Sequence, residues 1–362
     1  MKITSVESML LAIPFSDRDV QWRLGGTGHV FQTLMVRIDT DQVLSGWGEV
    51  FTKNGEASLK AMFDTHVRPA LIGRDPSHIN AIKRDLERQQ HNFGRVGVMA
   101  FCVSAVDLAL WDILGKAANL PLYRLLGGSP RTEIPLYASL ARYGAAPTVG
   151  RTTERAVREG YRAVKLHEVL VETVAGARAG GGPDIAVMLD TNCPWTLAEA
   201  KRNARRLEPF NLAWLEEPTW PPENVHALAE LRRSTTIPIA AGENAGSLID
   251  YRIMFEAGAV DFVQPDIAKA HGLTEALKIA ALAEAYDVAF MPHCFMIGPG
   301  YAHTIHLCAA HDVPLMERYY LDFAAEPMGD IVKPRAGKVA VPQGAELGCE
   351  PDPAAVKLYR VT

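Results

Sequence analysis

Seven ionisable side chains recur along the second half of the chain, each near the end of a short apolar run. They are His167, Asp190, Glu216, Glu243, Asp266, His293 and Glu317. Successive members are separated by 23 to 27 residues, about the length of one strand–helix unit. Because the carboxyl ends of the strands in a parallel β/α barrel meet at one face, this spacing predicts that all seven side chains converge there.

Each of these residues, taken alone, has a simpler explanation. An acidic residue after a strand is often the N-cap of the next helix, and a single histidine is often structural. Seven residues in register are hard to explain as caps, and so many like charges without a counter-charge would be costly. A divalent cation would supply the missing positive charge.

Three members of the series follow three consecutive apolar runs: Asp190, Glu216 and Glu243. Three carboxylates without a thiol form a site of hard oxygen ligands, which favours Mg²⁺ over zinc or copper. Asn192 and Asn244 stand beside two of these carboxylates. Each asparagine is a candidate donor to a metal ligand or a helix cap, and Asn192 is also a candidate substrate contact.

Two pairs of residues are candidates for proton transfer and substrate binding. Asp266 and His293 end neighbouring runs, and a carboxylate beside an imidazole fixes its tautomer and raises its basicity. His293 is therefore a candidate general acid or base. Lys165 and His167 are two residues apart on one strand, so both point into the barrel unless they lie at an exposed strand end. A lysine there needs a partner, and a substrate carboxylate would serve.

The last member of the series, Glu317, has two possible roles. A carboxylic acid with a raised pKa could donate a hydrogen bond to a developing enolate. The alternative is an ordinary salt bridge, for example to Lys269.

The apolar runs and the segments between them predict the architecture that positions these residues. The expected strands are Ile134–Leu140, Ala163–His167, Ile185–Asp190, Leu212–Glu217, Ile237–Glu243, Val260–Asp266, Val288–His293 and Leu315–Arg318. The expected helices include Thr153–Glu159, Ala198–Leu207, Val225–Arg233, Ile249–Ala257 and Thr274–Ala285. Such alternation favours a parallel β/α barrel. A doubly wound open sheet is the second possibility, but no GxGxxG follows any of the strands.

The first part of the chain has a different pattern. Strands are expected near Ile3–Leu11, at Phe31–Asp39 and at Leu44–Val50, with a glycine-containing loop at Ser16–Val30. Helices are expected at Ser58–Val67, His78–Gln90 and Gly97–Ala118. We predict an α+β domain over residues 1–126, a barrel over 127–330 and a separate C-terminal segment over 331–362.

Composition limits the class of protein. The 362 residues are 48% hydrophobic and 22% charged, with a formal net charge of −5, which predicts a packed globular protein of more than one domain. No Lys/Arg-rich tract is present, so nucleic acid is not an expected partner. Five cysteines without a CxxC pair predict a reducing cytoplasm rather than a disulfide framework. No segment is expected to be apolar over the roughly 18 residues that a membrane span needs, and no signal peptide is expected.

Taken together, the motifs resemble those of the mandelate racemase subgroup of the enolase superfamily. The resemblance covers nearly the whole chain. In the barrel it rests on Ala-Val-Lys165-Leu-His167, Met-Leu-Asp190-Thr-Asn192, Trp-Leu-Glu216-Glu217-Pro218, Ala-Gly-Glu243-Asn244, Gln-Pro-Asp266 and Pro-His293. Upstream it rests on Gly46-Trp47-Gly48-Glu49, Ala105-Val106-Asp107-Leu-Ala-Leu-Trp111-Asp112 and Pro121-Leu-Tyr-Arg-Leu-Leu-Gly127-Gly128.

The resemblance implies a (β/α)₇β barrel, a TIM-like barrel, covered by an N-terminal α+β capping domain to which the C-terminal segment returns. It implies that Asp190, Glu216 and Glu243 bind Mg²⁺, that His293 with Asp266 transfers protons and that Glu317 stabilises the enolate. The loops at Ser16–Val30 and Phe51–Ala57 would close over the substrate. Candidate contacts there are Arg18, Gln21, Trp22, Arg23 and His29.

One departure from the family pattern concerns the expected second strand. The family often has Lys-x-Lys there, whereas this chain has Lys165 and His167. An imidazole can replace the second lysine as a base near neutral pH. His167 could instead bind substrate only, leaving His293 to carry out every proton transfer. The short step from His167 to Asp190 also predicts a trimmed loop after this strand.

The expected reaction is Mg²⁺-dependent abstraction of the proton α to a carboxylate, a base–metal pairing known for enolase-superfamily sites. We predict dehydration of a sugar acid to a 2-keto-3-deoxy acid, because His293 with Asp266 can both take the proton and protonate a departing hydroxide. A racemase, epimerase or cycloisomerase is the alternative, and a non-catalytic metal-stabilised barrel is a third. The expected partner is a small carboxylate, with neither nucleic acid nor membrane, and related proteins are commonly homo-oligomers.

Overall fold

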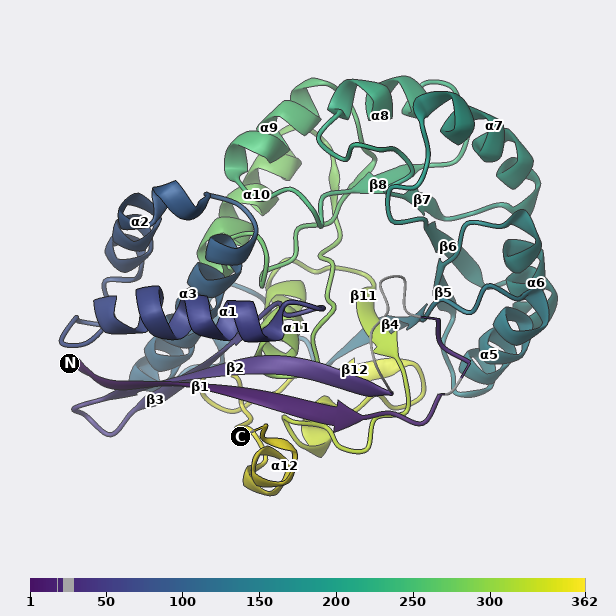
Figure 1. The fold of residues 1–362 in the computed structure, drawn as a ribbon. Helices are drawn as coiled ribbons and strands as arrows, with labels where there is room; N and C mark the ends of the chain where they lie inside the picture. Colours follow the sequence, from purple (N-terminus) through teal and green to yellow (C-terminus); the bar gives the residue numbers. More distant parts are fainter. Residues whose placement is uncertain (18, 22–28, 362) are drawn as a thin grey trace.

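The computed structural model describes residues 1–17, 19–21 and 29–361. A three-stranded sheet with its helices occupies one side of the molecule, and a ring of alternating strands and helices occupies the other (Figure 1). Three of the predicted substrate contacts, Arg18, Trp22 and Arg23, lie outside the described residues.

The N-terminal unit, here called the capping domain, is an antiparallel sheet covered by helices. Its strands pair in the order β1, β2, β3. They are β1 (Ile3–Pro14), β2 (Val30–Thr40) and β3 (Ser45–Val50). The following helical segments are α1 (Glu56–Met62), η1 (Phe63–Val67), η2 (Arg68–Ala70), α2 (Ile79–Gln89), η3 (His91–Phe93), α3 (Val98–Ala118) and α4 (Leu122–Leu125).

Helix α3 lies directly against β3. A Cβ atom at Gly46 would stand 2.0 Å from the carbonyl oxygen of Ala109, and one at Gly48 would stand 1.9 Å from that of Ala105. Any larger residue at these two positions would push the helix off the sheet, which explains why β3 alternates glycine with larger side chains.

Helix α3 corrects one expectation about the sequence. No segment long and apolar enough to cross a membrane was expected, but by length and composition alone this helix is one. In the structure, however, 78% of its most apolar 18-residue window is buried. Its apolar residues pack against the strands and helices of the capping domain, for example Val103 and Val106. A core helix therefore accounts for its hydrophobicity.

The second unit is a curled parallel sheet surrounded by helices. Its eight strands hydrogen-bond in the order β10-β9-β8-β7-β6-β5-β4-β11. They are β4 (Glu133–Leu140), β5 (Ala163–His167), β6 (Ala186–Asp190), β7 (Trp214–Glu216), β8 (Ile239–Ala241), β9 (Phe262–Val263), β10 (Ala289–Phe290) and β11 (Met316–Tyr320). Within the described part of the chain no backbone ladder joins β10 to β11, but the N–H of Cys294 donates to Glu317 across this gap.

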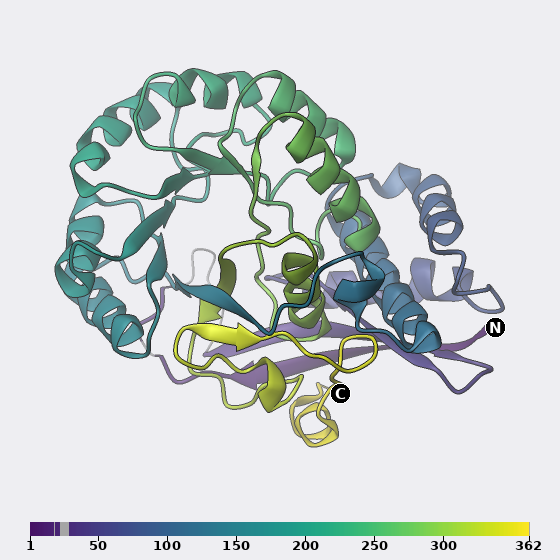
Figure 2. The same ribbon diagram turned by 180° about the vertical axis from the view of Figure 1, so that it is seen from behind.

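The helices of this unit form an outer ring, seen from both sides in Figures 1 and 2. They are α5 (Ala146–Arg158), α6 (Val171–Gly181), α7 (Leu197–Leu207), η4 (Glu208–Phe210), α8 (Val225–Arg232), α9 (Leu248–Glu256), α10 (Leu273–Ala285) and α11 (Pro299–Ala310). Capping boxes start α7 at Thr196 and α9 at Ser247, so these helices begin where their sequences satisfy the free N–H groups.

The C-terminal segment touches both units. After η5 (Asp330–Val332), the strand β12 (Lys338–Ala340) pairs antiparallel with β4. Helix α12 (Pro353–Tyr359) then packs near β1, and the N–H of Val361 donates to the carbonyl of Leu10. The predicted boundaries at residues 126 and 330 stay predictions.

The structure confirms the predicted fold class, a (β/α)₇β barrel with an α+β capping domain. Helix α6 was not among the predicted helices; it fills most of the short step from His167 to Asp190 and leaves only residues 168–170 between β5 and the helix. The predicted start of α5 at Thr153 was wrong, because the helix begins at Ala146 with proline in its first turn. Proline there is compatible with a helix start, because the first turn needs no backbone N–H donor.

Candidate metal and proton-transfer site

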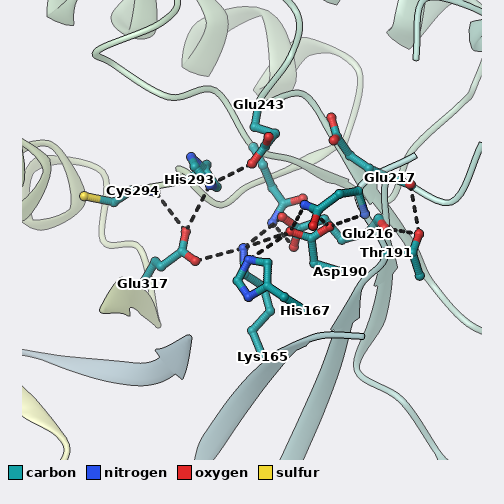
Figure 3. A network of polar contacts seen from close by, with 12 residues as sticks. Lys165, His167, Asp190, Thr191, Glu216, Glu217, Glu243, His293, Cys294 and Glu317 are labelled. Carbon is teal, nitrogen blue, oxygen red and sulfur yellow. Dashed lines mark hydrogen bonds and ion pairs between the residues drawn. The ribbon is translucent and has the colours of Figure 1, made fainter. Parts of the chain in front are cut away.

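The structure brings the seven spaced ionisable side chains together at the carboxyl ends of the strands. Figure 3 shows six of them, together with Lys165, in one network of hydrogen bonds and ion pairs. The seventh, Asp266, contacts His293. The convergence follows from the topology, since every parallel strand of the ring ends at the same face.

Three carboxylates form a compact acidic cluster. One oxygen each of Asp190, Glu216 and Glu243 lies within 4.8 Å of the others. Asp190 and Glu216 are fully buried. The donor set consists of carboxylate oxygens, which fits a hard divalent cation such as Mg²⁺.

The electrostatics of the cluster also fit a cation. Burial raises the pKa of Glu216 above its ordinary value, and the neighbouring Asp190 adds to the rise although Lys165 opposes it. The other two carboxylates shift the opposite way: burial raises each pKa, but His167 lowers that of Asp190, and His293 and Lys269 lower that of Glu243. These neighbours compensate part of the negative charge, and a divalent cation bound among the three carboxylates would compensate the rest.

Asparagine side chains donate hydrogen bonds to two of the three carboxylates of the cluster. The Nδ2 group of Asn192 lies 2.9 Å from both oxygens of Asp190. Asn244 donates through Nδ2 to Glu243 at 3.2 Å and to Glu217 at 2.7 Å. Both asparagines therefore act here as donors to carboxylates, and neither is a helix N-cap.

Two side chains that donate hydrogen bonds to Glu216 were not among the predicted site residues. Trp214 donates through Nε1 at 2.9 Å and Gln264 through Nε2 at 2.8 Å, both to Oε2 of Glu216. A signal was present, because Trp214 is two residues before Glu216 and Gln264 is two before Asp266. Residues two apart on a strand point to the same face.

Lys165 is fully buried between two carboxylates. Its Nζ lies 2.9 Å from Glu216 Oε1 and 2.8 Å from Glu317 Oε1. Burial lowers the pKa of Lys165, but these carboxylates outweigh burial and raise it well above its ordinary value. Lys165 therefore carries a positive charge at the point where Glu216 joins the acidic cluster.

Glu317 forms an ordinary salt bridge, the second of the two roles expected from the sequence, but with a different lysine from the one given as an example. Its partner is Lys165 rather than Lys269, which instead lies 3.4 Å from Glu243 Oε1. Burial would raise the pKa of Glu317, but Lys165, His293 and the Cys294 N–H lower it to about 2. The side chain is therefore a carboxylate that accepts hydrogen bonds, and the alternative with a raised pKa does not hold.

His293 lies between three carboxylates. Its Nδ1 is 2.7 Å from Asp266 Oδ2, and its Nε2 is 2.7 Å from Glu243 Oε2 and 3.8 Å from Glu317 Oε2. Burial lowers the pKa of His293, but the three carboxylates together raise it well above its ordinary value. Asp266 is held in turn by the N–H of Ala268 at 2.7 Å.

His167 approaches the acidic cluster from β5. Its Nδ1 lies 2.6 Å from the carbonyl oxygen of Leu140, and because a carbonyl only accepts, Nδ1 must be the protonated nitrogen. The other nitrogen, Nε2, faces Asp190 Oδ2 at 3.2 Å, and because a carboxylate also only accepts, this contact is a hydrogen bond only when Nε2 is protonated too. Strands β5 and β10 are separated by four strands in the sheet, so His167 and His293 approach from different sides.

The two described residues among the predicted loop contacts have different surroundings. The backbone N–H of Gln21 donates to the carbonyl of Arg142, just after β4, at 2.7 Å. The ring of His29 packs edge-on against Phe15 at 5.6 Å between centroids. Gln21 is therefore close to the end of a barrel strand, whereas His29 belongs to the junction of β1 and β2.

A cavity of about 360 Å³ opens beside the acidic cluster. Both domains line it. The capping domain contributes Val96, Gly97 and Phe101, and the barrel contributes Asn192, Glu243 and Lys269, among others. Small ligands commonly bind in such a cleft between domains.

Comparison with known proteins agrees with this geometry. Residues 20–127 match the model of the mandelate racemase / muconate lactonizing enzyme N-terminal domain, and residues 148–355 match the model described as enolase C-terminal domain-like.

Two curated relatives and one solved structure are similar over most of the chain. A 3,6-anhydro-alpha-L-galactonate cycloisomerase of Streptomyces coelicolor is 33% identical, covering 82% of this chain and 84% of that protein. A D-galactonate dehydratase of Variovorax paradoxus is 34% identical, with coverages of 74% and 72%. A racemase structure from Streptomyces coelicolor with bound magnesium has a TM-score of 0.86 and 30% identity, covering 99% of this chain and 100% of that one. The chain belongs to the mandelate racemase / muconate lactonizing enzyme family of the enolase superfamily.

Proposed function

We propose that this protein is a Mg²⁺-dependent sugar-acid dehydratase, which removes the proton α to a carboxylate and expels the β-hydroxyl as water. The observation that carries the proposal is the position of His293, whose two ring nitrogens each lie 2.7 Å from a carboxylate oxygen. One of these carboxylates belongs to the acidic cluster and the other orients the ring. A proton-transfer group thus stands at the edge of a site suited to a divalent cation.

In this proposal Asp190, Glu216 and Glu243 hold Mg²⁺. When bound, the ion supplies Lewis-acid stabilisation of the negative charge that develops on the substrate carboxylate. Support comes from the compact carboxylate cluster and from the magnesium bound in the related racemase of Streptomyces coelicolor.

The side chains then have separate tasks. His293, oriented by Asp266, takes the α-proton and returns a proton to the departing hydroxide, so no proton is gained or lost overall. Lys165, a buried cation beside Glu216, stabilises negative charge on the substrate carboxylate oxygens. Glu317 keeps Lys165 and the Cys294 loop in place through contacts at 2.8 and 2.9 Å.

A second candidate reaction is supported by His167. Its Nε2 faces the acidic cluster from β5, across the ring from His293. Two bases on different sides of one carbon allow removal of a proton from one face and delivery to the other. That arrangement suits a racemase or epimerase, and the relative named as a cycloisomerase keeps ring-opening isomerisation as a third outcome.

The same proposal includes a small carboxylate substrate, a homo-oligomeric state and a cytoplasmic location. The location is supported by five cysteines that are all free thiols.

Proton NMR in D₂O with a panel of aldonic and aldaric acids, with and without Mg²⁺, tests the proposed reaction. Mg²⁺-dependent appearance of a 2-keto-3-deoxy acid would establish the dehydratase. Loss of the α-proton signal without elimination would replace it with the epimerase or racemase. Absence of both in a protein that still binds Mg²⁺ would exclude the tested acids, and absence of Mg²⁺ binding would overturn the proposed site.

A further inference from the structure

Two lysines at the domain boundary each lie over an aromatic ring of the other domain. Lys53, just after β3 in the capping domain, has its Nζ 4.8 Å from the ring centroid of Phe295, in the loop after β10. Lys269, in the loop after β9, has its Nζ 4.8 Å from the ring centroid of Phe51 in the capping domain. The ring centroids of Phe51 and Phe295 are 5.9 Å apart, so the two cation–π pairs form one continuous contact between the domains.

The two ammonium groups differ in their polar partners. Lys269 lies 2.9 Å from Asn244 Oδ1 and 3.4 Å from Glu243 Oε1, so its charge is already neutralised. Among the residues that the structure describes, Lys53 has no hydrogen-bond or ion-pair partner, and charged side chains act on it only through longer-range electrostatics. The residues outside that set, 18, 22–28 and 362, contain no aspartate or glutamate either. No aspartate or glutamate of this chain is therefore left to pair with Lys53.

Lys53 stands among other cations near the acidic cluster. Burial lowers the pKa of Lys53, and the nearby Lys269 and Arg142 lower it further, whereas Glu243 and Asp190 oppose the shift. A cation bound by Glu243 and Asp190 would neutralise the two groups that favour the Lys53 charge. A substrate anion beside Lys53 would then restore the stabilisation of that charge.

We propose that Lys53 binds a second carboxylate of the substrate, so that the protein prefers dicarboxylic sugar acids to monocarboxylic ones. This inference rests on the proposed sugar-acid reaction and names its substrate class. The α-carboxylate belongs at the acidic cluster beside Lys165, which leaves Lys53 in the capping domain for the far end of the molecule. The cation–π contact with Phe295 holds the Lys53 ammonium at this position without supplying a hydrogen-bond acceptor.

The test compares a six-carbon aldaric acid with the aldonic acid of the same stereochemistry. The proteins are wild type, Lys53→Met, Lys53→Arg and the control Lys2→Met, an exposed lysine that precedes β1 in the same domain. We expect wild type to favour the aldaric acid in kcat/KM. Lys53→Met should lower kcat/KM for the aldaric acid roughly 10- to 100-fold, as for loss of a charge-assisted hydrogen bond.

The loss should appear mainly in KM, because the second carboxylate is distant from the reacting carbon. The aldonic acid should be little affected, Lys53→Arg should retain part of the preference, and Lys2→Met should resemble wild type. An equal loss for both acids, or an unchanged ratio in Lys53→Met, would overturn the proposal. So would a wild-type preference for the aldonic acid.

A binding measurement separates this inference from the proposed reaction. Calorimetric titration of the Mg²⁺-loaded protein with each acid reports on Lys53 whether or not turnover occurs. Tighter binding of the aldaric acid that is lost in Lys53→Met supports the inference even if no dehydration is seen. Turnover of sugar acids without any effect of Lys53 on binding leaves the reaction intact and rejects the role of Lys53.

Discussion

Nε2 of His293 lies 2.7 Å from Oε2 of Glu243, so the proposed acid–base group touches a proposed metal ligand. This contact joins two functions that the sequence places on different strands. Any cation that binds Glu243 competes with the imidazole for the same carboxylate. Metal binding and the protonation of His293 should therefore be linked.

The first prediction is that Mg²⁺ binding releases protons. Burial lowers the pKa of His293, but Glu243, Glu317 and Asp266 raise it well above its ordinary value. A cation bound to Glu243 neutralises one of the carboxylates that raise the pKa of His293. The pKa of His293 therefore falls, and the imidazolium releases a proton. Calorimetry in two buffers of different ionisation enthalpy should detect the release, and the apparent affinity for Mg²⁺ should rise with pH. His293→Asn should bind without this dependence; equal pH dependence in both proteins would contradict the linkage.

The second prediction concerns His293→Asn, which keeps a polar side chain of similar size but removes the titratable group. Turnover should fall at least about 100-fold, because general acid–base catalysis contributes this much or more. Binding of Mg²⁺ should persist because the three carboxylates are untouched. His226→Asn, an exposed histidine on α8, is the matched control. Full activity in His293→Asn would reject the assigned role.

The third prediction separates His167 from His293. If His293 carries out both proton transfers, His167→Gln should slow dehydration yet leave it measurable. Exchange of the substrate α-proton in D₂O should continue in this variant and stop in His293→Asn. Complete loss of exchange in His167→Gln, with Mg²⁺ still bound, would make His167 the base and favour the two-base alternative.

The fourth prediction concerns a buried carboxylate between the domains. Glu49 on β3 accepts a hydrogen bond from Thr33 Oγ1 and from the N–H groups of Gly298 and Gly300, at 3.1 and 2.9 Å, where α11 begins. Burial, only partly opposed by these donors, raises its pKa from 4.5 to about 7. A raised folded-state pKa means that the contribution to stability is present at low pH and is lost as pH rises through about 7.

Glu49→Gln removes this titration and keeps an acceptor for the two glycines. The difference in unfolding free energy between variant and wild type should therefore shift in favour of the variant by about 2 kcal/mol from pH 5 to pH 8. Urea unfolding at the two pH values measures this shift. A difference that does not change with pH would show that Glu49 does not titrate in this range.

The identity of the site residues follows from local properties of the sequence. Apolar runs predict strands, a spacing of 23 to 27 residues predicts strand–helix units, and parallel topology carries Asp190, Glu216 and Glu243 to one face. Period-two alternation placed Lys165 and His167 together for the same reason. Applied to Trp214 and Gln264, the same rule would have found the two donors to Glu216.

The pairing of these residues depends on the tertiary structure. Lys165 meets Glu216, 51 residues away, and Glu49 meets Gly298, 249 residues away. No local sequence pattern predicts that Glu317 pairs with Lys165 rather than with Lys269. Nor does one predict that the Lys53 ammonium lies over the Phe295 ring. Such contacts are set by how the strands curl and how the capping domain lies on the barrel. The sequence by itself therefore determined the kind of chemistry, whereas packing between distant segments decided which charge faces which.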